Sequence, residues 1–413
     1  MYRRILARTA LFAAVCAALA APTAAARAEP GPPAAPPAAG APAAERALFV
    51  PAANPAAAAQ ARELAVAGRR AEAEALTAMA TTPHAVWLGD QAPARAEAEA
   101  RETARTAARR GTLPVFALYN VPGRDCSQYS AGGADGSAAY RAWIDAVARG
   151  IGDHRAVIVL EPDSLALLPH ECAAAGAAAG SPGEFGGDLA RARTDARYAE
   201  IRYAVATLEA RPGADVYLDT GHAGWHTVDS IVPRLRDAGI DRATGFAVNV
   251  SNYHPDAANS WFATLVSACL AYADKGGNTA DCPDQRRPRR EAEQWLATRL
   301  TDADRARMKH YVTDSSRNGR GVWSPAAGKY RDPQDWCNPP GRGLGARPTT
   351  VTGDRLHDAK LWIKIPGESD GACLRGTAGP RDPERGVQDP PAGVWFPEQA
   401  LELARLANPA LMG

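Results

Sequence analysis

The stretch Ala156–Ser164, with the sequence AVIVLEPDS, decides how this chain folds. Its first five residues are apolar without interruption, which is typical of a parallel β-strand that is buried on both faces. Glu161, Pro162 and Asp163 follow at once, so two carboxylates come directly after the apolar run. The stretch therefore predicts a buried strand whose carboxyl end carries acidic side chains.

Similar short apolar runs recur on both sides of this stretch, and each is followed by a loop and a helical stretch rich in Ala, Arg and Glu. Further strands are predicted at Leu48–Val50, Ala85–Leu88, Pro114–Tyr119, Asp215–Leu218, Gly245–Val248, His310–Val312 and Leu361–Ile365. Helices are predicted at Glu97–Arg109, Ala138–Ile151, Asp195–Ala210, Val228–Asp237, Arg290–Leu300 and from Pro397 to about Ala407. Strands that alternate with helices indicate an α/β protein with a parallel sheet. Seven or eight such units in one chain favour a closed β/α barrel over an open sheet.

The composition excludes several classes of protein. The chain has 413 residues, of which 47 are basic and 46 acidic, and its net charge is +1. This balance argues against nucleic acid or an anionic membrane as the main partner. The 46% of hydrophobic residues excludes wholesale disorder. The 37 Gly and 33 Pro residues indicate long, shaped loops and a linker.

The N-terminal region has the pattern of a secretory leader. Basic residues precede the apolar run Thr9–Ala21, and Ala26-Arg27-Ala28 resembles a cleavage site for a signal peptidase. The run is too short to span a bilayer comfortably. We therefore expect a signal peptide at 1–28, an Ala/Pro-rich linker at 29–45 and a single domain at 46–413 without an attached binding module. The mature protein is expected to be extracellular and not bound to a membrane.

Cysteine usage agrees with export. Cys16 leaves with the leader, and six cysteines remain, at positions 126, 172, 269, 282, 337 and 373. An even number of cysteines in an oxidising compartment favours disulfides, which would hold the loops. Because no C-x-x-C occurs and the cysteines are far apart, a zinc cluster is disfavoured.

Polar and aromatic residues gather where the predicted strands end. In a parallel barrel, the carboxyl ends of the strands carry the chemistry. The residues at these ends are Trp87, Tyr119–Cys126, Glu161–Ser164, Asp219–Trp225, Asn249, Asn252, Asp314, Lys364 and Glu368–Asp370. Carboxylates beside flat aromatic rings are the pattern expected of a site for sugar rings.

Each of these residues also has a structural interpretation. Asp163 ends a wholly apolar strand, so burial would raise its pKa as a general acid requires. Asp125 lies next to Arg124 and could instead form a structural ion pair. Asp314 could be a turn or cap residue. Trp87, Trp225 and Trp336 could belong to the core.

Two other motifs in the sequence compete with a sugar site. His222 and His226 lie four residues apart, as metal ligands on a helix do, but the glutamate of a metalloprotease is missing and Gly224 breaks the helix. Gly367–Gly371 matches the G-x-S-x-G pattern of esterases. That pattern requires a later histidine, and the last one in the chain, His357, comes earlier.

Six segments together resemble glycoside hydrolase family 6, the secreted endoglucanases and cellobiohydrolases. The likeness extends from about Leu48 to Leu411. The segments are Tyr119–Cys126 (YNVPGRDC), Leu160–Leu165 (LEPDSL), Tyr217–Trp225 (YLDTGHAGW), Thr313–Gly319 (TDSSRNG), Trp336–Asn338 (WCN) and Trp362–Gly371 (WIKIPGESDG). The resemblance implies a distorted parallel β/α barrel of about seven strands and inverting hydrolysis of β-1,4-glucosidic bonds without a metal or an organic cofactor.

The resemblance also implies roles for particular residues. Asp163 matches the acid that protonates the leaving oxygen, and Asp125 matches the residue that keeps this acid protonated and helps to hold water. Asp370 matches the carboxylate usually proposed as the base. Asp219 matches a carboxylate that tunes the acid, and Tyr119 matches a tyrosine that crowds the sugar at the cleavage point.

Further positions match glucosyl-binding residues and disulfides of the family. The glucosyl-binding positions are Trp87, His222, Trp225, Asn252, Trp336, Lys364 and Glu368. The family pairs Cys126 with Cys172 and Cys337 with Cys373, which leaves Cys269 to pair with Cys282.

Together these observations predict a secreted endo-β-1,4-glucanase that acts as a monomer on β-1,4-glucan polysaccharides or cello-oligosaccharides. The loop between Asp370 and Trp395 is shorter than in tunnel-forming cellobiohydrolases, which favours an open cleft and internal attack. An exo-acting cellobiohydrolase and a glucan-binding protein without turnover are the alternatives. All four carboxylates are present, which argues against a pure binding protein, because aromatic rings alone would suffice for binding.

Overall fold

The computed structural model describes residues 45–172 and 188–412. The expected leader at 1–28 lies outside the described residues, as does the expected linker except for its last residue. Within the described part of the chain, no helix combines the length and the apolar character that crossing a membrane requires.

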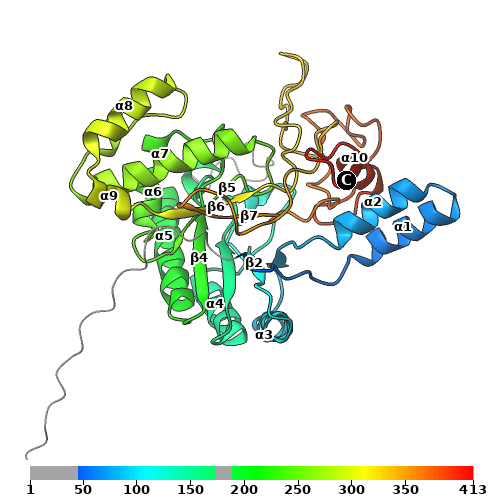
Figure 1. Ribbon diagram of the computed structural model, residues 1–413, viewed down its shortest axis with the longest axis horizontal. Helices are drawn as coiled ribbons and strands as arrows, with labels where there is room; N and C mark the ends of the chain where they lie inside the picture. Colours follow the sequence, from blue (N-terminus) through cyan, green and yellow to red (C-terminus); the bar gives the residue numbers. More distant parts are fainter. Residues whose placement is uncertain (1–44, 173–187, 413) are drawn as a thin grey trace, which may run out of the picture. The chain divides into compact units, whose positions relative to one another are not determined.

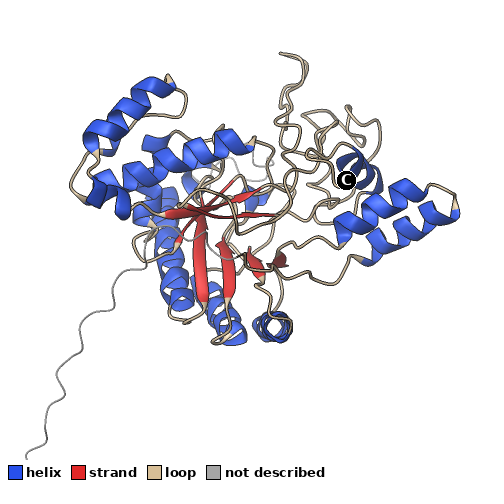
Figure 2. Ribbon diagram, in the orientation of Figure 1, coloured by secondary structure: helices blue, strands red, loops and turns tan. Residues whose placement is uncertain are grey.

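Seven parallel strands form one sheet in which every strand pairs with its neighbours in sequence. In β2 and β3, for example, Leu118 pairs with Leu160. The sheet curls into an incomplete barrel, drawn red in Figure 2, so the expected α/β fold and parallel β/α barrel are confirmed. The strands are β1 Val86–Leu88, β2 Val115–Leu118, β3 Ala156–Leu160, β4 Ala214–Asp219, β5 Gly245–Val248, β6 His310–Asp314 and β7 His357–Leu361.

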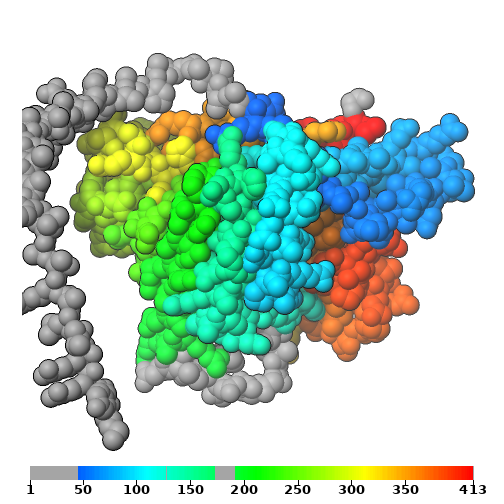
Figure 3. All heavy atoms as spheres, turned by 90° about the horizontal axis from the view of Figure 1, so that it is seen from below, coloured from blue at the N-terminus to red at the C-terminus, as the bar shows by residue number. Residues whose placement is uncertain are grey.

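Helices cover the outside of the sheet, and three of them lie side by side in the order of the chain (Figures 1 and 3). These three are α3 Pro93–Arg109, α4 Ser137–Ile151 and α5 Asp188–Glu209. The remaining helices are α1 Pro55–Val66, α2 Arg70–Ala80, α6 Val228–Asp237, α7 Asp256–Asp274, α8 Arg289–Arg299, α9 Asp302–Ala306 and α10 Pro397–Arg405. Short 3-10 turns occur at Asp125–Ser127, Pro169–Glu171 and Thr279–Asp281.

The alternation of side chains along β3 explains why the strand is apolar throughout. Ala156, Ile158 and Leu160 pack under the helices, whereas Val157 and Val159 fill the inside of the barrel. Because both faces are buried, neither can be polar. A separate cluster joins α1, α2 and α10 around Leu76 and Trp362.

Two predicted strands differ from the structure. Leu48–Val50 forms only an isolated bridge, in which Leu48 pairs with Leu113. The last strand is His357–Leu361 and not Leu361–Ile365. The segment after β7 is apolar because it is buried. Its main-chain N–H groups at Ile363 and Lys364 donate hydrogen bonds to the carboxylate of Asp314, at 3.2 and 2.9 Å. These amides therefore bind a side chain instead of a neighbouring strand.

The ends of the sheet meet at a narrow seam. Over the described residues, one main-chain hydrogen bond joins the two edges, from Ala85 N–H to the carbonyl of Trp362 at 2.9 Å. The indole N–H of Trp87 spans the same seam and donates to the carbonyl of Ile363 at 2.8 Å.

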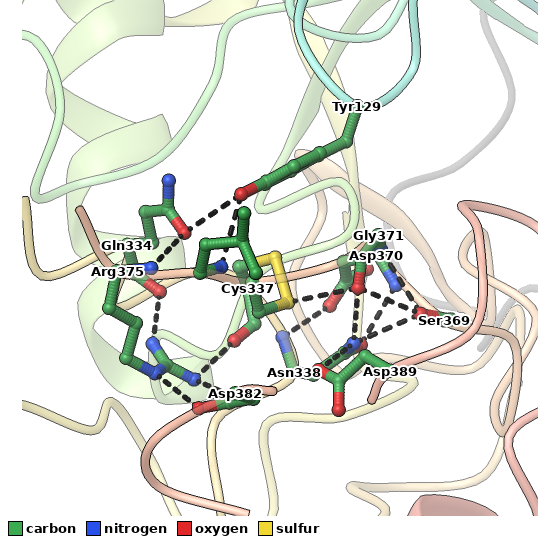
Figure 4. The surroundings of a disulfide bond; sticks show 12 residues. Tyr129, Gln334, Cys337, Asn338, Ser369, Asp370, Gly371, Arg375, Asp382 and Asp389 are labelled. Atoms are coloured by element: carbon green, nitrogen blue, oxygen red, sulfur yellow. Dashed lines mark hydrogen bonds and ion pairs between the residues drawn. A yellow bond between two sulfur atoms is a disulfide. The ribbon is translucent and has the colours of Figure 1, made fainter. Parts of the chain in front are cut away.

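Among the described residues, three disulfides hold the loops. Cys126–Cys172 and Cys337–Cys373 are the pairs that the family resemblance implied, and the two remaining cysteines, Cys269 and Cys282, pair with each other as expected. Cys126–Cys172 ties the loop after β2 to the loop after β3. Cys269–Cys282 joins α7 to the segment after it. Cys337–Cys373 links the long loop between β6 and β7 to the loop after β7 (Figure 4).

Candidate active site

A cavity of about 960 Å³ lies at the carboxyl ends of the strands. Loops that follow all seven strands contribute to its wall. The lining includes all but one of the residues that the sequence predicted for the site, namely Trp87, Tyr119, Asp125, Asp163, His222, Trp225, Asn252, Trp336, Lys364, Glu368 and Asp370. The exception, Asp219, is buried at the end of β4 behind Asp163.

Asp163 is held in an unusual main-chain conformation. Its φ angle is +68°, and that of Glu161 is +54°. Such angles are uncommon for residues other than glycine and concentrate at functional sites. The N–H of Asp163 donates to Asp219 Oδ2 at 2.7 Å, and the hydroxyl of Tyr119 lies 3.5 Å from Asp163 Oδ2. Asp219 therefore fixes the main chain of Asp163, which leaves the Asp163 carboxyl in the cavity.

The surroundings of Asp163 raise its pKa to about 7. Burial makes the largest contribution, and the negative charges of Asp125 and Asp370 add to it. Asp219 is affected in the same way, because burial and the neighbouring Asp163 raise its pKa well above the usual range. Asp163 is therefore a carboxyl group that is about half protonated at pH 7 and mostly protonated below it.

Asp125 lies at the turn after β2, where its φ angle is +57°. Its Oδ2 accepts a hydrogen bond from the N–H of Ser130 at 2.7 Å. Arg124 forms its ion pair with Asp90, at 2.9 Å, and not with Asp125. Burial raises the pKa of Asp125, although the N–H of Ser130 and the charge of Arg124 oppose the shift.

Asp370 has the opposite character. Burial opposes its ionisation, but the nearby charges of Arg317 and Lys364 outweigh burial and lower its pKa. Its oxygens contact Arg317 Nη1 at 2.8 and 3.0 Å and Lys364 Nζ at 3.2 Å. The main-chain N–H of Asn338 donates to it at 3.0 Å and the hydroxyl of Tyr253 at 3.3 Å (Figure 4 shows Asn338). Asp370 is thus an ionised, fully bonded carboxylate.

Aromatic rings stand at several points along the cavity. Trp87 contacts Tyr119 edge to face, with 5.5 Å between ring centroids. Trp336 lies 6.2 Å from Tyr129, which reaches it from the loop after β2. Trp225 lies 5.6 Å from His222 on the loop after β4. Flat aromatic faces beside polar groups suit sugar rings, whose C–H faces are apolar and whose hydroxyls form hydrogen bonds.

His222 and His254 form a stacked pair whose ring centroids are 4.3 Å apart. Burial, and then the neighbouring histidines, lower the pKa of His222 to about 3, so its ring is neutral. Nδ1 of His222 accepts from the N–H of Gly224 at 3.2 Å, which leaves the proton on Nε2. A Cβ atom at Gly224 would lie 2.6 Å from the His254 ring, so the pair requires glycine there.

Three other candidate residues, Asp314, Ser369 and His226, have structural roles. Asp314 is buried and accepts from the N–H groups of Ser251 and Ser316 as well as from the loop after β7. Ser369 is buried and donates to the carbonyl of Pro390 at 2.8 Å, unlike an esterase nucleophile. His226 contacts the carbonyl of Ala166 at 2.7 Å.

One group of side chains in the described residues has the spacing of metal ligands, Cys373 with Asp382 and Asp389. The sulfur of Cys373 is already in a disulfide. Both oxygens of Asp382 bind the guanidinium of Arg375 at 3.0 Å. The group therefore does not offer a free ligand set.

Sequence reasoning missed several residues that line the cavity or hold its members. Tyr129, His254 and Trp323 line it, and Arg317 holds Asp370. Arg317 lies within the TDSSRNG segment and could have been proposed as a partner for a carboxylate. Trp323 lies between Val322 and Ser324, outside the six family segments, so no sequence signal identified it.

Comparison with known proteins agrees with this geometry. A family model described as glycosyl hydrolases family 6 matches residues 43–407. Endoglucanase A of Cellulomonas fimi is 35% identical over 334 residues, which cover 81% of this chain and 56% of that protein. The 1,4-β-D-glucan cellobiohydrolase C of Emericella nidulans is 32% identical over 367 residues, which cover 82% of this chain and 72% of that protein.

A solved structure is similar in both sequence and fold. Endoglucanase Cel6 from Mycobacterium tuberculosis, in complex with methyl-cellobiosyl-4-deoxy-4-thio-β-D-cellobioside, is 34% identical and has a TM-score of 0.63. The match covers 88% of this chain and 98% of that one. The chain spans little more than half, 56%, of the length of two of the endoglucanases that it matches. The match of the family model over residues 43–407 includes every strand of the barrel and every loop that lines the cavity, and this chain belongs to the glycosyl hydrolases family 6.

Proposed function

We propose that this protein is a secreted endo-β-1,4-glucanase that cleaves cellulose-type glucans with inversion at the anomeric carbon. The observation that carries the proposal is Asp163, a carboxyl group with a pKa of about 7 in a cavity that aromatic rings line. A general acid works best when its pKa lies near the working pH. Asp163 would protonate the glycosidic oxygen as the bond to the leaving sugar breaks.

The second half of the reaction requires a water molecule on the opposite face of the sugar. In inverting enzymes the two carboxyl groups are roughly 6.5–9.5 Å apart, which leaves room for this water. The family pattern matches Asp370 to the base, but its lowered pKa and its bonds to Arg317 and Lys364 make it a poor proton acceptor. Asp125 has a raised pKa and fewer partners, so we assign it the proton of the attacking water.

Asp370 then acts as a fixed negative charge. It helps to keep Asp163 protonated and stabilises the positive charge that develops on the sugar ring in the transition state. Asp219 acts through the main chain of Asp163, and Tyr119 crowds the sugar at the cleavage point.

Glucosyl units would bind along the cavity by stacking and hydrogen bonding. Trp87, Trp225 and Trp336 offer ring faces, and the neutral His222 offers its Nε2–H as a donor. Asn252, Lys364 and Glu368 line the same cavity and suit sugar hydroxyls. No step of this scheme requires a cofactor.

The support for endo rather than exo action comes from relatives. Two bacterial proteins named endoglucanases are 35% and 34% identical to this chain. The cellobiohydrolase C of Emericella nidulans is 32% identical, so exo action is the alternative. Export is supported by the leader-like pattern at 1–28 and by the three disulfides. We propose that the secreted protein acts as a monomer on glucan chains or cello-oligosaccharides.

The test is a pair of matched variants. Asp163→Asn removes the proton donor with little change in shape, and Asp229→Asn changes an exposed aspartate on α6 outside the cavity. We expect the first to lose about a hundredfold to ten-thousandfold in the release of reducing sugar from carboxymethyl cellulose, because general acid catalysis contributes about 10²–10⁴. The second should be unchanged.

Full activity of Asp163→Asn would refute the assignment of the acid. Product analysis tests the remaining claims. Hydrolysis of cellohexaose at internal bonds, with the α-anomer seen first by NMR, is expected. Cellobiose as the only early product would favour the exo alternative, and a β-anomer would exclude inversion. Binding of glucan by the wild type without any turnover would leave a binding protein.

A further inference from the structure

Trp323 lines the cavity from the long loop between β6 and β7. The same loop carries Trp336, so two tryptophans of one loop face the same cavity. Trp323 is partly buried, and its neighbour Val322 is 50% exposed. A bulky aromatic side chain that remains accessible in a cavity has a face to offer to a ligand.

One side of the Trp323 ring is covered by a guanidinium group. The central carbon of Arg375 lies 4.7 Å from the ring centroid, in a cation–π arrangement. Arg375 is completely buried and binds Asp382 through two bonds of 3.0 Å. It also donates to the carbonyls of Gln334 and Cys337, at 2.7 and 2.9 Å (Figure 4).

The residues that hold Arg375 under the Trp323 ring are tied together by several bonds and are therefore rigid. The disulfide Cys337–Cys373 lies beside Arg375, and the hydroxyl of Tyr129 binds the Gln334 side chain at 3.3 Å (Figure 4). A ring that rests on a fixed guanidinium has few orientations available before a ligand arrives. Binding to such a preformed surface requires less ordering of side chains, which favours affinity.

The polar edge of Trp323 is not used by the protein. Among the described residues, no group accepts a hydrogen bond from its indole N–H. The indole N–H of Trp87, in contrast, is bound to the carbonyl of Ile363. Tryptophan in a binding site commonly combines an apolar face with a free N–H donor.

Groups that suit sugar hydroxyls line the same cavity. Asp332 and Asp335 line the cavity on the same loop, and their carboxylates offer oxygen acceptors. A flat apolar face in a cavity that also carries oxygen acceptors fits a glucosyl unit. We infer that Trp323 is a stacking platform for one glucosyl unit of the bound glucan, in addition to the platform at Trp336. This inference rests on the proposed function.

The platform gives the loop between β6 and β7 a role in the choice of substrate length. A chain that contacts Trp323 as well as Trp336 gains a stacking contact that a chain too short to reach both rings does not make. Affinity is therefore expected to rise with chain length more steeply in the wild type than in a variant that lacks the Trp323 ring.

Calorimetric titration with cellotetraose and cellohexaose tests the inference without turnover if all proteins carry Asp163→Asn. In that background Trp323→Ala is expected to weaken cellohexaose binding about tenfold, the effect of some 60 Å² of apolar area that is no longer buried. Trp323→Leu keeps an apolar cover over Arg375 but lacks the flat ring, and it should be weakened similarly. Trp323→Phe should recover most of the affinity.

Trp261→Ala is the matched control. Arg289 lies 4.4 Å from the Trp261 ring centroid, and Trp261 is on α7 outside the cavity. Its removal should leave the dissociation constants unchanged. If Trp323→Leu binds cellohexaose as tightly as the background protein, Trp323 only covers Arg375 and the inference is wrong. If the background protein binds neither oligosaccharide, the proposed function itself fails.

Discussion

Asp163 can deliver a proton only while it is protonated, so its pKa of about 7 fixes one side of the pH profile. Activity on unactivated glucan is expected below that pH, and kcat/KM should fall about tenfold per pH unit above it. The charge of Asp125 contributes to the raised pKa. Asp125→Asn removes this negative charge, so the pKa of Asp163 and the alkaline limb should both move to lower pH.

Two measurements check this prediction. The pH dependence of the residual activity of Asp125→Asn gives the position of the alkaline limb. NMR titration of the Asp163 carboxyl gives its pKa without turnover. Asp229→Asn, which leaves the cavity unchanged, should keep the wild-type profile. An alkaline limb that stays in place in Asp125→Asn would show that the charge of Asp125 does not hold the proton on Asp163.

At the residue scale, the sequence indicated the acids more readily than their partners. Asp163 could be proposed because it follows a predicted strand, and Asp370 because it lies within a family motif. Arg317, which sets the charge state of Asp370, lies far from it in sequence, and only the fold brings the two together at 2.8 Å. Arg124 could not be assigned to Asp90 rather than Asp125 from adjacency, because the loop geometry decides which carboxylate it reaches.

At the scale of elements, α3 and α4 show how a stripe of small residues lets helices approach closely. Ala96, Ala100, Ala104 and Ala107 are the buried residues of α3. On α4, a Cβ atom at Gly150 would lie 2.5 Å from the carbonyl oxygen of Glu97 and 2.8 Å from Ala100 Cβ. The helices can therefore pack this closely only with glycine at position 150.

Gly150→Ala is expected to destabilise the protein by about 1–3 kcal/mol, because the added methyl group overpacks the contact. Helix propensity alone would give the opposite sign, a gain of about 0.5–1 kcal/mol. Chemical denaturation measures the difference. Ala142→Gly, on the exposed face of the same helix, isolates the propensity effect and should cost only about 0.5–1 kcal/mol. A Gly150→Ala protein as stable as the wild type would contradict the close contact.

Element prediction succeeded where hydrophobic periodicity and burial coincide. The helix Val228–Asp237 was predicted at its observed bounds, and β3 likewise. It failed at Leu361–Ile365, where an apolar segment leaves the sheet because a buried carboxylate binds its amides. The long loops after β6 and β7 have no periodicity, so Trp323 and Arg375 received no position from the sequence.

At the scale of the whole molecule, the disulfides connect the loops that carry the site. Cys126 follows Asp125 directly, and its partner Cys172 lies on the loop after β3, which also carries Asp163. Cys269–Cys282 lies away from the cavity. Both disulfides stabilise the fold, and we expect that only the first also aligns the two carboxyl groups.

Replacing Cys126 and Cys172 by Ala should lower kcat/KM on glucan at least about tenfold, because small misplacements of catalytic groups are costly. The matched double variant of Cys269 and Cys282 should keep kcat/KM. Each pair should lose about 3–4 kcal/mol of unfolding free energy by the loop-entropy relation. Equal kcat/KM in the two double variants, measured below their melting temperatures, would show that Cys126–Cys172 has no part in alignment.

The seam between β1 and β7 bears on what a bound glucan does to the protein. A single main-chain bond there resists separation far less than a ladder does. Trp87 is on β1, and its indole N–H donates across the seam to the carbonyl of Ile363, which follows β7. A sugar that stacks on Trp87 and binds Lys364 and Glu368 would contact both edges of the sheet at once. The bound polysaccharide would then cross-link the first and last strands and brace a barrel that the protein alone closes with a single main-chain bond.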